Sequence, residues 1–434
     1  MRIPLCRLRS SVIFITPFPT PLTLSTHLLK EEVVKKQYFL IIGLVLALSL
    51  VLIACGGGGG GGKEGPIKIG AIYDMTGPTA DVGAPYGRGE QGYVDWLNSK
   101  GGVNGRQIEL IGQDYAYKVD QAEQLYSQYV NQDKVVAFLG WGTGDTEALR
   151  GKIAKDKIPF MSASYSINLA KIDEAPYNFM PGVTYSDQMV IALKWVLEDA
   201  KKKGVEPKVV VFHHDSPFGQ SPVPDGKAFA DANGIAYTDI AMPKGATDLT
   251  PQLTQAQDFG VNYVVIQNVS SPAALLLKNA KSLGMTDQTQ FICLNWCADE
   301  LFVKLAEGAA EGALGVMPFT SDFSVPGAKD PAEYLKSKGK SLDEEGLHYV
   351  QGWWTAATMV EGIKRTLDAK KDLTGENIKA SLEAMQNFST GDVTAPIGFT
   401  PTDHRGNDKA KIHQVQGGVW TPITDYMQSR IPVQ

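Results

Sequence analysis

The sequence predicts an α/β protein built from two doubly wound parallel sheets. Its 434 residues exceed the size of one ordinary hydrophobic core, which favours two lobes. From Pro66 onward, short apolar runs alternate with amphipathic segments in two successive series. Strands that alternate with helical patterns form parallel sheets with helices on both faces. A composition of 43% hydrophobic and 20% charged residues is that of an ordinary globular protein.

The first series predicts the first sheet and its helices. The helical segment Tyr86–Ser99 places Tyr93, Trp96 and Leu97 at the spacing of a buried face, and a glycine pair at 101–102 ends it. The expected strands are Ile67–Tyr73, Ile108–Gln113, Val135–Leu139 and Ile158–Ser162, and the expected helices are Tyr86–Ser99, Gln121–Asn131 and Thr146–Lys155.

The second series predicts the second sheet. Val209–Phe212 is a nearly continuous apolar run, which is typical of a parallel strand buried on both faces. The helix Gln188–Lys203 ends in three lysines, which suit the negative end of a helix dipole. The further expected strands are Ala236–Ile240, Tyr263–Gln267, Phe291–Leu294 and Ala313–Val316, and the further helices are Lys227–Asn233, Leu249–Phe259, Pro272–Leu283, Glu300–Ala306 and Gly346–Leu367. A final hairpin is expected from Lys411–Val415 and Val419-Trp420.

The N-terminal region predicts export and a lipid anchor. A Lys35-Lys36 pair precedes an apolar run, Tyr38–Ala54, and its Leu-Ile-Ala-Cys ending resembles a bacterial lipobox. The alternative is a short transmembrane helix. We therefore assign residues 1–54 to an N-terminal extension and lipoprotein signal peptide. Residues 55–65 then hold the lipidated Cys55 and a flexible glycine tether.

Charge and cysteine content exclude some classes of function. The chain has 41 Lys and Arg against 47 Asp and Glu, and an acidic chain without a basic stripe argues against nucleic acid binding. Cys293 and Cys297 have no histidine nearby in sequence and make a poor zinc site. In an oxidising compartment they form either a short-loop disulfide or two buried free thiols, and both alternatives stay open.

The motifs give no positive evidence for an enzyme, a cofactor or a metal. Gly140–Gly144 follows a strand and opens a helix, but Asp145 replaces the third glycine of a dinucleotide fingerprint. The nucleophile elbow and the zinc-protease motif are absent from the sequence. His213 and His214 are neighbours on an expected strand, so their side chains point to opposite faces and cannot share one metal.

Three strand ends in the first half predict a ligand site. In open parallel sheets, ligands bind beyond the carboxyl ends of the strands. The three loops there, Tyr73–Gly83, Gly140–Thr146 and Ser162–Ser166, are rich in glycine and hydroxyl residues. Thr143 or Gly144 would cap the following helix, whose free N–H groups and dipole attract a carboxylate. The plain alternative is that these residues are ordinary caps and turns.

Several stretches resemble the type 1 periplasmic binding proteins, and among them the leucine/isoleucine/valine-binding group. The similar stretches are IGAIYDMTGPTADVG at 69–83, NSKGGVNGR at 98–106, HDSPFG at 214–219, APIGFTPTDHRG at 395–406 and QGGVW ending at 420. The resemblance implies two lobes joined by three crossovers near Pro181–Thr184, Phe319–Ser324 and Thr394–His404. Lobe 1 would comprise residues 66–182 and 322–395, and lobe 2 residues 183–321 and 396–434.

The resemblance also implies ligand contacts, and this sequence departs from the family pattern at some of them. Val82 stands where an aromatic residue often precedes the glycine of the first loop, and Ser164-Tyr165-Ser166 replaces the threonine of the third loop. Trp296 stands near the expected second-lobe acid, for which Asp299 could substitute, and Tyr165, Tyr185 and Trp296 could line an aromatic pocket. The expected ligand-binding residues are Tyr73, Trp141, Gly142, Thr143, Gly144, Ser162, Ala163, Ser164, Tyr165, Phe218, Trp296 and Asp299.

The function that the resemblance implies is capture of a small molecule outside the cytoplasm. The protein would close around an amino acid of the branched-chain kind, or a related polar metabolite, and deliver it to the membrane permease of an ABC importer. Two alternatives stay open. One is a ligand-sensing domain of the same fold, and the other is an amide, urea-like or aromatic acid ligand in the same cleft.

Overall fold

The computed structural model describes residues 65–429 and 431, so the predicted signal peptide, Cys55 and the glycine tether lie outside the described residues. The strands are β1 Ile67–Tyr73, β2 Ile108–Asp114, β3 Ala137–Gly140, β4 Phe160–Ser162, β5 Asn178–Phe179, β6 Lys208–His214, β7 Ala236–Met242, β8 Tyr263–Gln267, β9 Gln290–Cys293, β10 Leu314–Met317, β11 Lys409–Gln416, β12 Val419–Pro422 and β13 Met427–Gln428.

The helices alternate with these strands. They are α2 Ala80–Ser99, α3 Val119–Gln128, α4 Thr143–Asp156, α5 Tyr185–Lys203, α6 Pro217–Gln220, α7 Val223–Ala232, α8 Thr250–Phe259, α9 Ser270–Ser282, α10 Glu300–Ala306, α11 Lys329–Ser337, α12 Leu342–Glu345, α13 Leu347–Asp368 and α14 Gly375–Glu383. No helix in the described part of the chain is both long and apolar enough to cross a membrane.

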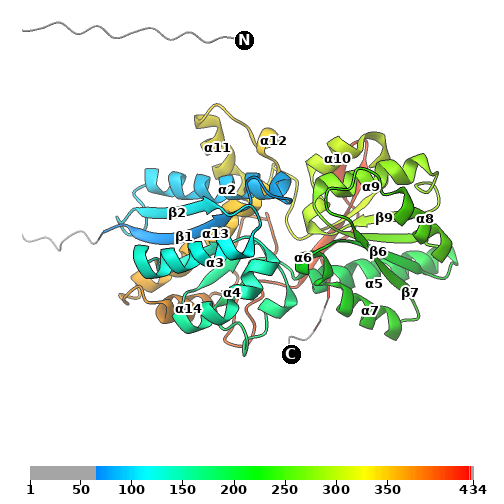
Figure 1. The fold of residues 1–434 in the computed structure, drawn as a ribbon. Coiled ribbons are helices and arrows are strands. Elements are labelled where there is room, and N and C mark those ends of the chain that lie inside the picture. Colours follow the sequence, from blue (N-terminus) through cyan, green and yellow to red (C-terminus); the bar gives the residue numbers. More distant parts are fainter. Residues whose placement is uncertain (1–64, 430, 432–434) are drawn as a thin grey trace, which may run out of the picture. The chain divides into compact units, whose positions relative to one another are not determined.

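Lobe 1 is built on a parallel sheet with the order β2-β1-β3-β4-β5. Strands β1 and β2 lie in this lobe with α2, α3, α4, α13 and α14 (Figure 1). The buried face of β1 packs with residues of α13 and α14 in one hydrophobic core. Ile397 and Phe399 belong to the same core, so the chain stays with lobe 1 beyond residue 395, where we expected lobe 2 to resume.

Lobe 2 is built on a sheet with the order β12-β11-β10-β9-β8-β6-β7. The strands from β10 to β7 are parallel, whereas β11 runs antiparallel to β10 and forms the predicted hairpin with β12. Helices α5 to α10 belong to this lobe (Figure 1). Helix α5 begins after Thr184, whose hydroxyl accepts the N–H of Asp187 at 3.0 Å, and ends at Gly204 in the left-handed conformation.

The stretches that join the lobes lie side by side. Met180 pairs with Arg405, and Phe319 pairs with Thr394, through isolated β-bridges. All three predicted crossovers are thereby brought together. The predicted α/β class with two parallel-sheet lobes is confirmed.

Some elements differ from the prediction. Helix α2 begins at Ala80 rather than Tyr86, and α4 begins at Thr143 rather than Thr146. The expectation that Thr143 or Gly144 caps α4 is wrong, because Gly142 occupies the cap position and makes no side-chain hydrogen bond. Helices α6, α11, α12 and α14 and strands β5 and β13 were not predicted. The open question on the cysteines is answered: Cys293 and Cys297 are free and buried.

Candidate functional site

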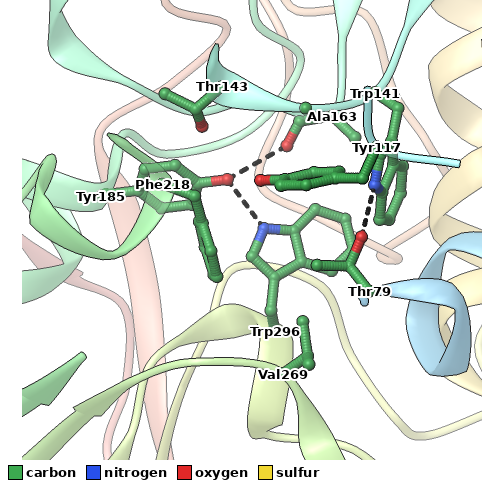
Figure 2. A pocket seen from close by; sticks show the side chains of 10 residues that line it. Thr79, Tyr117, Trp141, Thr143, Ala163, Tyr185, Phe218, Val269 and Trp296 are labelled. Carbon is green, nitrogen blue, oxygen red and sulfur yellow. Dashed lines mark hydrogen bonds between the residues drawn. The ribbon is translucent and has the colours of Figure 1, made fainter. Parts of the chain in front are cut away.

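A small cavity of about 20 Å³ lies between the lobes (Figure 2). Lobe 1 and lobe 2 both supply its walls, which are formed by Thr79, Tyr117, Trp141, Gly142, Thr143, Ala163, Tyr185, Phe218, Val269 and Trp296. The lobe 1 residues come from loops that follow β1, β2, β3 and β4, and the lobe 2 residues include loops after β6, β8 and β9. The cavity therefore sits beyond the carboxyl ends of both parallel sheets, which is where open α/β sheets bind ligands.

The first turn of α4 forms one wall. Gly142 and Thr143 both line the cavity, and the first N–H groups of a helix have no partners within it. The hydroxyls of Thr143 and Ser164 share a hydrogen bond of 2.8 Å. Ser164 is itself held by the Ser162 hydroxyl, which accepts the Ser164 N–H at 3.1 Å. This geometry presents hydroxyl and N–H donors to an anionic group.

Aromatic rings form most of the remaining wall. Trp141 of lobe 1 meets Trp296 of lobe 2 edge-on, with ring centroids 5.0 Å apart. Tyr165 stacks on the other side of this contact, nearly parallel to Trp296 at 5.9 Å. Tyr185 and Phe218 make an edge contact at 5.4 Å. The rings give the cavity a largely apolar lining, and this low-dielectric environment strengthens any hydrogen bond made inside it.

The polar atoms among these rings are bonded to one another (Figure 2). The Trp296 indole N–H donates to the Tyr185 hydroxyl at 2.9 Å, and that hydroxyl lies 3.3 Å from the Ala163 carbonyl, to which it donates. On the opposite side the Trp141 indole N–H donates to the Thr79 hydroxyl at 2.9 Å. Thr79 in turn donates to the buried carboxylate of Asp74 at 2.6 Å.

Asp145 lies behind the α4 wall. The Tyr115 hydroxyl donates to its Oδ1 at 2.8 Å, whereas its Oδ2 is buried and has no hydrogen-bond partner within the described part of the chain. Burial raises the pKa of Asp145 to about 7. The carboxyl group is therefore only partly ionised at neutral pH, so it opposes an anion at the α4 start less than a full charge would.

Three carboxylates join the lobes around the cavity. Asp81 of α2 accepts the N–H of Ser271 in α9 at 2.9 Å, and Glu300 of α10 accepts the N–H of Leu347 in α13 at 3.1 Å. Asp299 accepts from His348 at 3.0 Å. Burial would lower the pKa of His348, but its hydrogen bond to Asp299 and the charge of Asp299 outweigh burial and raise it.

The expected site residues fall into two groups. Trp141, Gly142, Thr143, Ala163, Phe218 and Trp296 all line the cavity. The other six do not line it. Ser162, Ser164 and Tyr165 lie behind the wall, and Gly144 lies outside it. Tyr73 packs against Gly87 and Gly112, and Asp299 caps α10. Asp299, which we expected to substitute for a ligand-binding acid, does not line the cavity, and its oxygens accept from Phe302, Ser270 and His348.

Thr79, Tyr117 and Val269 line the cavity without having been predicted. Tyr117 follows β2, and Val269 follows β8. The strand-end rule that singled out three loops of lobe 1 would have found both residues if it had been applied to every strand. Neither His213 nor His214 lines the cavity. His213 bonds to Asp239, and His214 bonds to Ser216 while its ring packs against the cavity residues Tyr117 and Phe218.

Comparison with known proteins decides the family. The family model described as periplasmic binding protein matches residues 66–419. The chain belongs to this family. Among its relatives, the leucine-, isoleucine-, valine-, threonine- and alanine-binding protein of Pseudomonas aeruginosa is 24% identical over 348 residues, covering 79% of this chain and 87% of that protein.

Solved structures agree with this assignment. A branched-chain amino acid ABC transporter protein from Thermus thermophilus, solved with bound valine, is 30% identical, with a TM-score of 0.78 over 85% of this chain and 98% of that one. A solute-binding protein of an ABC transporter from Rhodopseudomonas palustris BisB5, in complex with 3,4-dihydroxybenzoic acid, shares the fold at 20% identity, with a TM-score of 0.70 over 84% of this chain and 98% of that one. The predicted resemblance to type 1 periplasmic binding proteins is confirmed.

Proposed function

We propose that this binding protein captures a small carboxylate for an ABC importer, by closing its two lobes around the ligand. The observation that carries the proposal is a cavity whose walls come from both lobes and include the first turn of α4. A ligand that touches both lobes stabilises the closed form, because only there can it make all its contacts. A membrane permease would then recognise the closed form.

The first candidate ligands are amino acids of the branched-chain kind and related small polar metabolites. The support is the Thermus thermophilus relative solved with valine, which shares 30% of its residues over most of both chains.

The test is to identify what the protein carries and then to measure its binding. The protein is purified from its own cells, unfolded to release the bound molecule, and the molecule is identified by mass spectrometry. Calorimetric titration of the stripped and refolded protein should give one site per chain. A protein that carries no small molecule and shows no binding in a broad screen of amino acids and organic acids would contradict the proposal.

We infer further that Cys55 is lipidated after export, so that the binding domain is tethered outside the cytoplasm. The support is the Leu-Ile-Ala-Cys sequence before seven glycines and a domain of an extracytoplasmic family. Replacing Cys55 by Ala should release the protein from the membrane fraction. An unmodified Cys55 in the N-terminal peptide of the mature protein would contradict this.

A further inference from the structure

We propose that the binding site extends beyond the cavity at α4 into a second, larger pocket of the same cleft, and that this pocket holds the body of the ligand. The inference rests on the proposed function, because it concerns the ligand of the same cleft. It ranks the candidate acids by the length of their side chains. An acid with a long apolar side chain that ends in a hydrogen-bond acceptor fills both compartments, whereas valine fills only the first.

The sizes of the two compartments support a division of the ligand between them. The cavity at α4 measures about 20 Å³, and a single water molecule needs about 10–15 Å³ of such volume. The second pocket measures about 360 Å³, and small-molecule sites measure about 300–1,000 Å³. The cavity therefore takes no more than a head group, and the pocket has the volume for the rest of the molecule.

The pocket and the cavity are neighbours in one cleft. Pro78 and Asn268 line the pocket, and the residues that follow them in the chain, Thr79 and Val269, line the cavity (Figure 2). Pro78 belongs to lobe 1, whereas Asn268 and the other pocket residues belong to lobe 2. A molecule in the pocket therefore contacts both lobes and adds to the stability of the closed form.

The ring of His214 stands between the two compartments. It lines the pocket, and it packs against the cavity residues Tyr117 and Phe218 with ring centroids 6.4 and 5.9 Å away. Burial lowers the pKa of His214 to about 4, so the ring is neutral at neutral pH and can lie against an apolar chain. Its Nδ1 lies 2.7 Å from the Ser216 hydroxyl, the one hydrogen-bond partner of the ring among the described residues that we find on this side. A ligand that passes from one compartment to the other has to shift this ring.

The lining of the pocket suits an apolar body with an acceptor at its end. Met242, Leu249 and Leu275 supply apolar side chains. Asn268 is only 2% exposed, and its amide donates to the Met242 sulfur at 3.2 Å, a weak acceptor that leaves most of the donor capacity of the amide unused. Lys244 lines the same pocket from an exposed position and adds a positive charge. A carboxylate or carbonyl group at the end of the ligand would bind these two donors.

The test is a series of straight-chain amino acids of increasing length. Calorimetry on the purified full-length protein, stripped of its co-purified molecule, compares norvaline, norleucine and 2-aminooctanoate. We expect the affinity to rise about threefold for each added methylene group that becomes buried, so that 2-aminooctanoate binds at least about tenfold more tightly than norvaline. A second probe, 2-aminooctanedioate, has the same number of carbons but ends in a carboxylate, and we expect it to bind severalfold more tightly than 2-aminooctanoate.

Several results would overturn the proposal. An affinity that is constant along the series, or that falls beyond norvaline, would do so while leaving the proposed function intact. If 2-aminooctanedioate binds no more tightly than 2-aminooctanoate, the acceptor end assigned to the ligand is wrong. If no member of the series binds, the proposal fails, and the identity of the co-purified molecule decides the proposed function separately.

A variant tests the location of the second compartment. Ala246 lines the pocket and is half-buried, so the ring introduced by Ala246→Phe would occupy part of its volume. We expect the preference for 2-aminooctanoate over norvaline to shrink severalfold. Ala236→Phe is the matched control, because Ala236 is exposed at the other end of β7 and lines neither compartment. An unchanged preference in a folded Ala246→Phe variant would overturn the assigned location.

Discussion

The double substitution Thr143→Val with Ser164→Ala tests whether the start of α4 holds the ligand's carboxylate. The two hydroxyls share a hydrogen bond of 2.8 Å, and Thr143 lines the cavity. A hydrogen bond to a charged group contributes about 1.5–3 kcal/mol. Since 1.4 kcal/mol is a tenfold change in affinity, the loss of one such bond should weaken binding by about tenfold to a hundredfold.

The fold should survive this double substitution. Both partners of the internal hydrogen bond leave together, so no buried hydroxyl remains without a partner. Val also has nearly the shape of Thr. Calorimetry with the co-purified ligand measures the affinity, and thermal unfolding without ligand measures the stability. We expect the midpoint of unfolding to change by only a few degrees.

Thr358→Val is the matched control for this experiment. Thr358 is also buried, but its hydroxyl donates to the Trp354 carbonyl within α13 at 2.7 Å, and it does not line the cavity. The affinity of the Thr358→Val variant for the co-purified ligand should stay at the wild-type value. If the double variant is folded and binds as tightly as the wild type, the Thr143 and Ser164 hydroxyls do not hold the carboxylate and the reasoning is refuted.

Three further predictions concern titration and thiol chemistry. His348 contacts Asp299 only across the closed cleft, so closure raises the pKa of His348 above the ordinary value of 6.5. Ligand affinity should therefore be highest below pH 6.5 and fall as the pH rises through the raised pKa. Calorimetry from pH 5.5 to 8.5 should show a weaker pH dependence of affinity in His348→Gln, and a slope equal to that of the wild type would contradict this. Burial raises the pKa of Glu90 well above 4.5, so the folded state holds a proton that the unfolded state releases. The unfolding temperature of Glu90→Gln should therefore rise relative to that of the wild type as the pH increases from 5 to 8. A difference in unfolding temperature that stays constant with pH would contradict this. Cys293 and Cys297 are buried, and burial raises the pKa of the Cys293 thiol. Iodoacetamide should therefore label both cysteines only after the protein is unfolded, as measured by peptide mass spectrometry. Labelling of the native protein, or a disulfide-linked peptide, would contradict this prediction.

Local patterns in the sequence were sufficient to predict the two sheets and to point to the edge at which the cavity lies. Strands such as β6 and β8 are short apolar runs between helical patterns, and this pattern needs no long-range information. The start of α4 was misplaced by three residues, because Gly142 caps the helix through its backbone and carries no side chain that would mark it.

The remaining features depend on contacts between distant residues. In the sequence alone, Asp299 looked available for a ligand. In the structure His348, 49 residues later in the chain, donates a hydrogen bond to one of its carboxylate oxygens. Likewise Tyr185 is recognisable as an aromatic residue near a crossover, yet its bond to Ala163 depends on how the lobes meet, and its bond to Trp296 joins residues 111 positions apart within lobe 2. The chemical character of the cavity follows from such pairings and cannot be derived from any single segment.

The contacts across the cleft explain why a ligand can control closure. The aromatic contact between Trp141 and Trp296 favours the closed form, because it removes apolar surface from water. Closing also buries Asp81 and Glu300, and burial raises the pKa of both, which means that the charged forms are destabilised there. The aromatic contact thus favours closure and the buried carboxylates oppose it, and a ligand that contacts both lobes shifts the equilibrium by the difference between its affinities for the two forms.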